Sequence, residues 1–267
     1  MGDLYLIPDR EHIAESMELS EQYHACFEYN DFFLPDILED GDRVRKIIGF
    51  YKSLHRDMSR DMMHGAFLDL VVHSEDRRIR EISELRMRQS MEIAAGMNLR
   101  GVVFHGNAIP NFQTDSYLAR WLEYNEAFLR RLLREYPGQD IYFENMFDQE
   151  PELLVRLAER MRDEERFGIC YDYAHACVFG HGIEEWTRKL APYTKHMHIN
   201  DNDLKVDLHQ SVGSGLIDWH HYVKCIQDAG ITGSVLVEVK SLDSQRKSLE
   251  YMQKNDIYPF AMPAVSA

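Results

Sequence analysis

The stretch from His196 to Gly215 concentrates residue types that bind metal ions. Its histidines and aspartates are His196, His198, His209, Asp201, Asp203 and Asp207, and a Gly-Ser-Gly segment follows them. Imidazole and carboxylate groups together suit Mn²⁺, Co²⁺, Mg²⁺ or Zn²⁺, and a larger share of imidazole favours Zn²⁺. A solvated polar loop can have the same composition. The positions of the predicted strands and helices around this stretch are therefore needed to distinguish a metal site from a plain loop.

Short apolar runs alternate with longer amphipathic stretches along the chain. The expected strands cover 4–7, 25–29, 61–65, 101–106, 141–145, 167–172, 196–200 and 234–239, and the clearest expected helices cover 83–97, 116–138, 150–165 and 218–230. Such alternation predicts parallel strands joined by right-handed crossovers, and eight units predict a closed (β/α)8 barrel. A doubly wound open sheet is the alternative, but no glycine-rich phosphate loop follows the first run.

Six of the eight expected strands carry a metal-binding side chain at or just past their C-terminal end. These side chains are His64, His105, Glu144, Asp172, His198 and Glu238. The C-terminal ends of barrel strands converge on one rim, so we expect these residues to face one another. A single histidine at a strand end is usually part of the loop structure. A carboxylate that ends an apolar strand is seldom buried without a partner, and a bound cation would offset its desolvation.

The neighbouring loops add further candidate ligands. Asp172 and His175 lie three residues apart, and Asp207 and His209 lie two apart, so the latter pair shares one face of an extended chain. Asp201 is expected to support His198 from behind. His196 faces the same way as His198 but lies deeper, so we interpret it as a barrel-interior residue, and we interpret 213–215 as a plain turn. The remaining histidines are expected at the surface: His12, His24, His55, His73, His181, His220 and His221.

Length and composition restrict the class of protein. The chain has 267 residues, of which 45% are hydrophobic, and we expect a single domain over 1–267. A net charge of -15 argues against a nucleic-acid partner, because contacts to phosphates supply most of that affinity. Four cysteines without a CxxC spacing indicate free thiols. No signal-peptide pattern and no membrane-spanning run is present, so we expect a cytoplasmic location. The sequence is compatible with a homo-oligomer.

An ordered series of motifs resembles the xylose isomerase-like TIM barrels. The motifs are "HGAFLDL", "VVFHG", "FENM", "YDYAHA", "HMHIND", "DLHQSVGSGLIDW" and "VLVEV". The resemblance runs from His64 to Glu238 and depends on the order of the motifs more than on any one of them. This superfamily contains sugar (phosphate) isomerases and epimerases together with the type-IV AP endonucleases, that is, AP endonuclease family 2.

The isomerase branch implies one divalent metal ion, Mn²⁺, Co²⁺, Mg²⁺ or Zn²⁺, held by Glu144, Asp172, His198 and Glu238. The ion would stabilise an enediolate formed from a small sugar or sugar-like hydroxy-carbonyl substrate. Glu144 and Glu238 would act as the general acid and base that move the proton. His175 would bind a substrate hydroxyl or carbonyl group.

The endonuclease branch implies a trinuclear Zn²⁺ cluster with further ligands. The matching positions are His64, His105, His175, Asp207 and His209, so these residues are expected to bind either the substrate or additional metal ions. The loop after His105, "GNAIPNF", has no cation to hold a phosphate backbone. The better-defined epimerases carry an arginine a few residues after the histidine that matches His198. In this chain the only cation in that segment, "NDNDLKVD", is Lys205. We therefore favour a metal-dependent isomerase or epimerase, with an AP-endonuclease-type phosphodiesterase, a dehydratase and a non-catalytic binding barrel as alternatives.

Overall fold

The computed structural model describes residues 2–112 and 114–261, which form a closed barrel of parallel strands. The strands are β1 (Leu4–Leu6), β2 (Cys26–Tyr29), β3 (Met62–His64), β4 (Gly101–His105), β5 (Asp140–Glu144), β6 (Phe167–Asp172), β7 (Thr194–Ile199) and β8 (Ser234–Val237). Each strand is hydrogen-bonded to the next, and β8 closes onto β1. The predicted (β/α)8 fold is confirmed, and the doubly wound sheet is excluded. All eight strands lie where the apolar runs predicted them.

Helices follow the strands along the chain. They are α1 (Ile13–Tyr23), α2 (Pro35–Glu39), α3 (Gly41–Lys52), α4 (Arg77–Met97), α5 (Asp115–Glu135), α6 (Glu152–Arg160), α7 (Tyr173–Phe179), α8 (Ile183–Leu190), the 3-10 turn η1 (Ala191–Tyr193), α9 (Trp219–Ala229) and α10 (Leu242–Lys254). The four predicted amphipathic stretches form α4, α5, α6 and α9. Asp218 caps α9 by accepting hydrogen bonds from two main-chain N–H groups, and Gly230 ends it in the left-handed conformation. No described helix has the length and hydropathy needed to cross a membrane.

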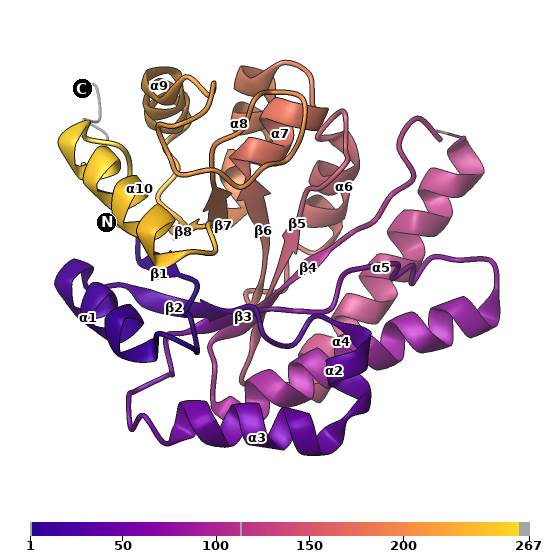
Figure 1. The fold of residues 1–267 in the computed structure, drawn as a ribbon. Coiled ribbons are helices and arrows are strands. Elements are labelled where there is room, and N and C mark those ends of the chain that lie inside the picture. Colours follow the sequence, from indigo (N-terminus) through magenta and orange to yellow (C-terminus); the bar gives the residue numbers. More distant parts are fainter. Residues whose placement is uncertain (1, 113, 262–267) are drawn as a thin grey trace. The chain divides into compact units, whose positions relative to one another are not determined.

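The chain forms two compact units, and the prediction of one domain over 1–267 stays a prediction. Unit 2 comprises residues 27–144 and 156–168. Its strands β3, β4 and β5 pair in register, and α4 and α5 follow β3 and β4 (Figure 1). The fully buried Trp121 of α5 donates from its indole to the carbonyl oxygen of Gly106 over 2.9 Å. A Cβ on Gly106 would lie 2.6 Å from the Trp121 ring, so this close approach requires glycine.

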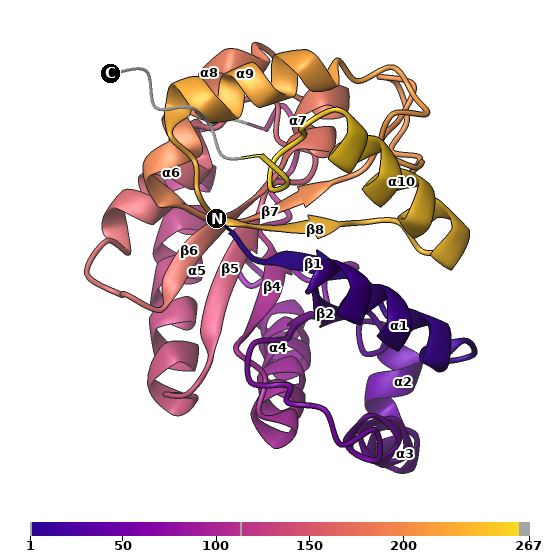
Figure 2. The ribbon, with the colours of Figure 1, turned by 90° about the vertical axis from the view of Figure 1, so that its left-hand side faces the viewer.

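Unit 1 comprises residues 1–26, 145–155 and 169–267. In it β8 pairs with both β1 and β7, and β7 pairs with β6. Figure 2 shows β1 and β8 side by side, with α1 and α10 following them. A cluster of buried aromatic rings packs behind these strands, where Tyr173 contacts both Tyr222 and Trp219. Full burial of side chains of this size stabilises the unit by roughly 2–3 kcal/mol each.

Candidate active site

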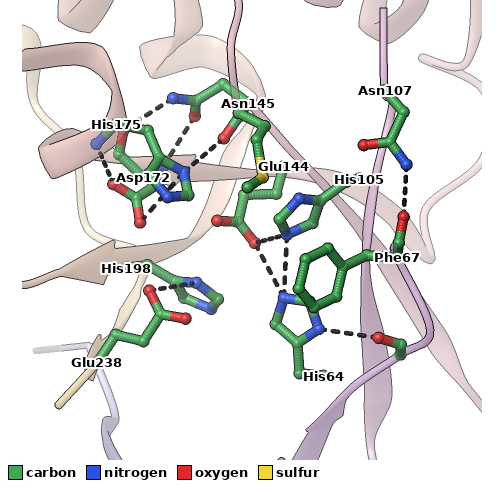
Figure 3. Close-up of polar contacts among 12 residues, drawn as sticks. His64, Phe67, His105, Asn107, Glu144, Asn145, Asp172, His175, His198 and Glu238 are labelled. Carbon is green, nitrogen blue, oxygen red and sulfur yellow. Dashed lines mark hydrogen bonds and ion pairs between the residues drawn. The ribbon is translucent and has the colours of Figure 1, made fainter. Parts of the chain in front are cut away.

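Asp172 stands at the junction of β6 and α7 and is held there by Asn145. The main-chain N–H of Asp172 donates to the side-chain oxygen of Asn145 over 2.9 Å, and the side-chain amide of Asn145 donates to the carbonyl oxygen of Asp172 over 2.8 Å. The Asp172 carboxylate also caps α7, since it accepts from the main-chain N–H of His175 over 2.6 Å. Figure 3 shows these contacts. The direction of the Asp172 carboxylate is thereby fixed by hydrogen bonds to main-chain atoms.

Asp172, His198 and Glu238 converge within unit 1. One ligand atom from each lies within 4.8 Å of the others, and all three side chains are buried. Nδ1 of His198 is 3.5 Å from Oε2 of Glu238 (Figure 3). Two ligand atoms, each about 2.1 Å from one tetrahedral ion, stand about 3.4 Å apart. The separation and the donor types therefore fit a divalent cation held between these side chains.

His175, Asp207 and His209 form a second set in unit 1. His175 lies in α7 and not in the loop where the sequence suggested it, and its Nδ1 is 2.9 Å from the carbonyl oxygen of Asn145. Nδ1 of His209 is likewise 2.9 Å from the carbonyl oxygen of Glu238. Both Nδ1 atoms must donate to these carbonyls, which leaves both Nε2 atoms able to coordinate a cation.

The two Nε2 atoms face one carboxylate oxygen. Oδ2 of Asp207 is 3.3 Å from His175 Nε2 and 2.9 Å from His209 Nε2. Burial alone would raise the pKa of Asp207, but hydrogen bonds from the two imidazoles hold it well below its usual range. Burial alone would lower the pKa of His209, but the charges of Glu238 and Asp207 raise it to about 10. This set therefore favours positive charge at its centre, which protons on the imidazoles or a metal ion in their place can provide.

His64, His105 and Glu144 form a third set, which lies within unit 2. Their ligand atoms are within 4.8 Å of one another, with His105 Nε2 3.0 Å and His64 Nε2 3.6 Å from Oε2 of Glu144. His64 Nδ1 is bound to the carbonyl oxygen of Gly65, which again directs Nε2 to the shared carboxylate. The ring of Phe67 stacks on His105 with centroids 4.7 Å apart and meets the edge of His64, as Figure 3 shows. An aromatic surface therefore borders this set.

Asp201 organises the loop that follows β7. Its carboxylate accepts hydrogen bonds from the main-chain N–H groups of Gly213 and Ile217 and from the indole of Trp219, at 2.9, 3.1 and 2.8 Å. Gly213 has φ +85°, and a Cβ there would overlap Tyr251, so the turn requires glycine at this position. These hydrogen bonds hold the loop that carries Asp207 and His209, and none of them involves His198. The expected support of His198 by Asp201 stays a prediction.

The other predicted histidines divide into confirmed and corrected positions. His196 is fully buried and bonded to Ser234, as an interior residue should be. His73 was expected at the surface, but it is 1% exposed, and its Nε2 is 3.1 Å from the Tyr117 hydroxyl. The prediction was wrong because the partner lies on α5, far along the chain. The remaining predicted surface histidines are exposed or partly exposed: His12, His24, His55, His181, His220 and His221. The four cysteines are free thiols, as predicted.

Sequence reasoning missed three residues beside these sets. Asn145, which directly follows Glu144, fixes Asp172 and His175. Phe67 borders the His64 set, and Asn107 holds the Phe67 carbonyl oxygen at 2.6 Å (Figure 3). Each is close in sequence to a predicted ligand, and this position after a strand end was the only signal available.

A family model and several known proteins match this chain. Residues 27–255 match the family described as xylose isomerase-like TIM barrels. Protein MJ1311 of Methanocaldococcus jannaschii, which is uncharacterized, is 26% identical over 203 residues, covering 72% of this chain and 69% of that protein. A probable endonuclease 4 of Protochlamydia amoebophila is 32% identical over 116 residues, covering 38% of this chain and 40% of the endonuclease.

Two solved structures share the fold. The TTHB071 protein of Thermus thermophilus, from a crystal soaked with ZnCl₂, has a TM-score of 0.74 at 22% identity and covers 94% of this chain and 97% of its own. A D-tagatose 3-epimerase-like protein has a TM-score of 0.72 at 22% identity, covering 94% and 96%.

Proposed function

Since the chain belongs to the xylose isomerase-like TIM barrel family, we propose that it is a divalent-metal-dependent isomerase or epimerase of a small sugar or sugar-like hydroxy-carbonyl compound. Asp172, His198 and Glu238 would hold the ion together with Glu144, the residue that ends β5. The convergence of buried Asp172, His198 and Glu238 is the observation that carries this proposal. Three carboxylates and one imidazole suit Mn²⁺, Co²⁺, Mg²⁺ or Zn²⁺.

The chemistry proposed for this set is proton transfer next to a carbonyl group. A divalent ion there would polarise two adjacent substrate oxygens and so increase the acidity of the neighbouring C–H bond. Of Glu144 and Glu238, one would remove the proton from carbon as its general base, and the other would return a proton to carbon as its general acid. With Nδ1 donating to the carbonyl oxygen of Asn145, Nε2 of a neutral His175 would accept a hydrogen bond from a substrate hydroxyl group, and a protonated His175 would donate one to a substrate carbonyl oxygen.

The surroundings of the proposed site support a small substrate. Phe67 presents an aromatic face beside His64 and His105, which suits a sugar ring or short carbon chain better than a charged backbone. The loop from Asn145 to Gln149 and the loop after His105 contain no lysine or arginine. The D-tagatose 3-epimerase-like structure, which shares the fold, is consistent with such a substrate.

The test is a panel of ketoses incubated with the metal-loaded enzyme in D₂O and followed by NMR. The proposal predicts deuterium incorporation at the carbon next to the carbonyl, together with a second sugar as product. Glu144→Gln and Glu238→Gln should each lower kcat by about 100- to 10,000-fold, because each loses a proton-transfer group. Product formation without deuterium incorporation, or full activity in either variant, would exclude this mechanism.

A second candidate function is a zinc phosphodiesterase of the AP-endonuclease type. The specific observation in its favour is that the His64–His105–Glu144 and His175–Asp207–His209 sets each have ligand atoms within 4.8 Å of one another. Together with Asp172, His198 and Glu238, these two sets could hold further ions. Sites with several metal ions stabilise both the attacking and the leaving oxygen of a phosphoryl transfer. The local sequence identity to a probable endonuclease 4 also supports this candidate function.

The two candidates separate in one assay. A duplex oligonucleotide with a single abasic site would be incubated with the Zn²⁺-loaded protein beside the ketose panel. Strand cleavage that is lost in both His64→Gln and His209→Gln would favour the phosphodiesterase. Ketose turnover without cleavage would favour the isomerase.

A further inference from the structure

Asn200 directly follows β7 and has a buried amide that the protein leaves without partners. Its side chain is 0% exposed. Neither its Oδ1 nor its Nδ2 forms a hydrogen bond with any described residue. A primary amide can donate two hydrogen bonds and accept two, and burying it unpaired is costly. Such a group in a folded protein calls for an explanation.

The alternation along β7 indicates where Asn200 faces. His196 and His198 lie on one face of the strand, with their ring centroids 5.1 Å apart. Asp201 lies on the opposite face, where it binds the indole of Trp219 in α9. Asn200 therefore shares the face of His198 and stands about 7 Å further toward the carboxyl end of the strand. Asp172 and Glu238 each have a ligand atom within 4.8 Å of a ring nitrogen of His198.

Asn202 is a second buried asparagine in the same segment. It shows which hydrogen bonds a structural amide forms there. Its Oδ1 accepts from the main-chain N–H of Leu204 over 2.9 Å, and its Nδ2 is 3.5 Å from the carbonyl oxygen of Ala174. The fold thus provides partners for Asn202 and none for Asn200 among the described residues, although both side chains are 0% exposed.

We propose that Asn200 is a substrate-binding residue that determines specificity in the reaction proposed above, on which this inference rests. Nδ2 would donate to a substrate carbonyl or enediolate oxygen, and Oδ1 would accept from a neighbouring hydroxyl group. A polyhydroxy carbonyl compound offers both kinds of partner side by side. A phosphodiester offers only acceptors and would leave Oδ1 unpaired, so the amide selects for a hydroxylated substrate.

The first test compares thermal unfolding of ligand-free, metal-free Asn200→Leu with that of Asn202→Leu. Leucine has a similar shape but no polar atoms, so replacing an unpaired amide should leave the midpoint equal to or above that of the wild type. Asn202→Leu loses real hydrogen bonds and should unfold at a lower temperature. An equal fall in both variants would show that the Asn200 amide is structural and would overturn the proposal.

The second test uses the ketose that the wild-type enzyme turns over. Asn200→Leu should lower kcat/KM by about 10- to 100-fold, the effect of losing one or two hydrogen bonds to a reacting substrate, with unchanged metal content. An unchanged kcat/KM would overturn the role of Asn200. If the wild type turns over no ketose, the proposed function fails, while the ligand-free comparison still decides whether the Asn200 amide is reserved for a ligand.

Discussion

The carbonyl oxygen of Asn145 lies 2.9 Å from Nδ1 of His175, and the side chain of the same asparagine is bonded to both the N–H and the carbonyl group of Asp172. One residue thus sets the tautomer of a histidine and the position of a carboxylate without being a candidate ligand itself. Supporting groups of this kind hold metal ligands in orientation and often matter nearly as much as the ligands.

Replacing Asn145 with alanine should therefore weaken both the fold and metal binding. Two buried main-chain groups of Asp172 would lose their partners, so we expect a loss of about 2–4 kcal/mol in the free energy of unfolding. We also expect about 10- to 100-fold weaker binding of Zn²⁺ or Mn²⁺, measured by competition with a chelating dye. Asn125→Ala is the matched control, because Asn125 is a buried asparagine of α5 that bonds to its own helix. Equal metal affinity in the two variants would contradict this role.

Asp201 should control the order of the loop after β7. Asp201→Asn keeps the shape of the side chain but removes the charge that accepts hydrogen bonds from Gly213, Ile217 and Trp219. We expect a large shift of the Trp219 indole N–H resonance in a ¹⁵N-labelled sample and faster proteolysis within 202–217. The indole resonances of Trp121 and Trp186 serve as internal controls. A variant spectrum in which all three indole resonances stay in place would refute the assignment.

His73 should make the metal-free protein less stable in mild acid. Burial, together with the positive charge of Arg120, lowers the pKa of His73 from 6.5 to about 4. The unfolded chain therefore takes up a proton below pH 6.5 that the folded chain does not accept until about pH 4. The stability contributed by neutral His73 is fully present above the unfolded pKa and is lost as the pH falls, by about 3 kcal/mol in total.

Urea unfolding of the wild type and His73→Gln at about pH 7 and about pH 4.5 measures this contribution. The variant should lose about 2 kcal/mol less than the wild type between the two pH values, since glutamine does not titrate. Identical losses would show that His73 does not carry the effect.

The meeting of the strand-end residues was predictable because a parallel barrel brings the carboxyl ends of its strands to one rim, wherever they lie in the sequence. Within each unit the structure confirms this convergence for Asp172, His198 and Glu238 and for His64, His105 and Glu144. Asp207 and His209, which their spacing predicted to share a face, lie 2.9 Å apart, although His209 is in the left-handed conformation and the segment is not an extended strand.

What the sequence could not provide was the partner of each polar group. Nothing in the pattern separates Asn202, which has internal hydrogen bonds, from Asn200, which has none among the described residues. The burial of His73 depends on Tyr117, a residue 44 positions away on another helix. Short helices such as α7 were missed because most of their residues are buried and show no amphipathic period.

Elemental analysis of the protein, purified without a tag and without added metal, examines the proposed metal centre itself. We expect about one equivalent of Mn²⁺, Co²⁺, Mg²⁺ or Zn²⁺ per chain, lost in His198→Gln and retained in His64→Gln, because His198 belongs to the proposed four-residue set and His64 does not. Two to three equivalents of Zn²⁺ that fall in both variants would contradict a single-ion isomerase and favour the phosphodiesterase. A chain that binds no ion after incubation with each metal would contradict both functions.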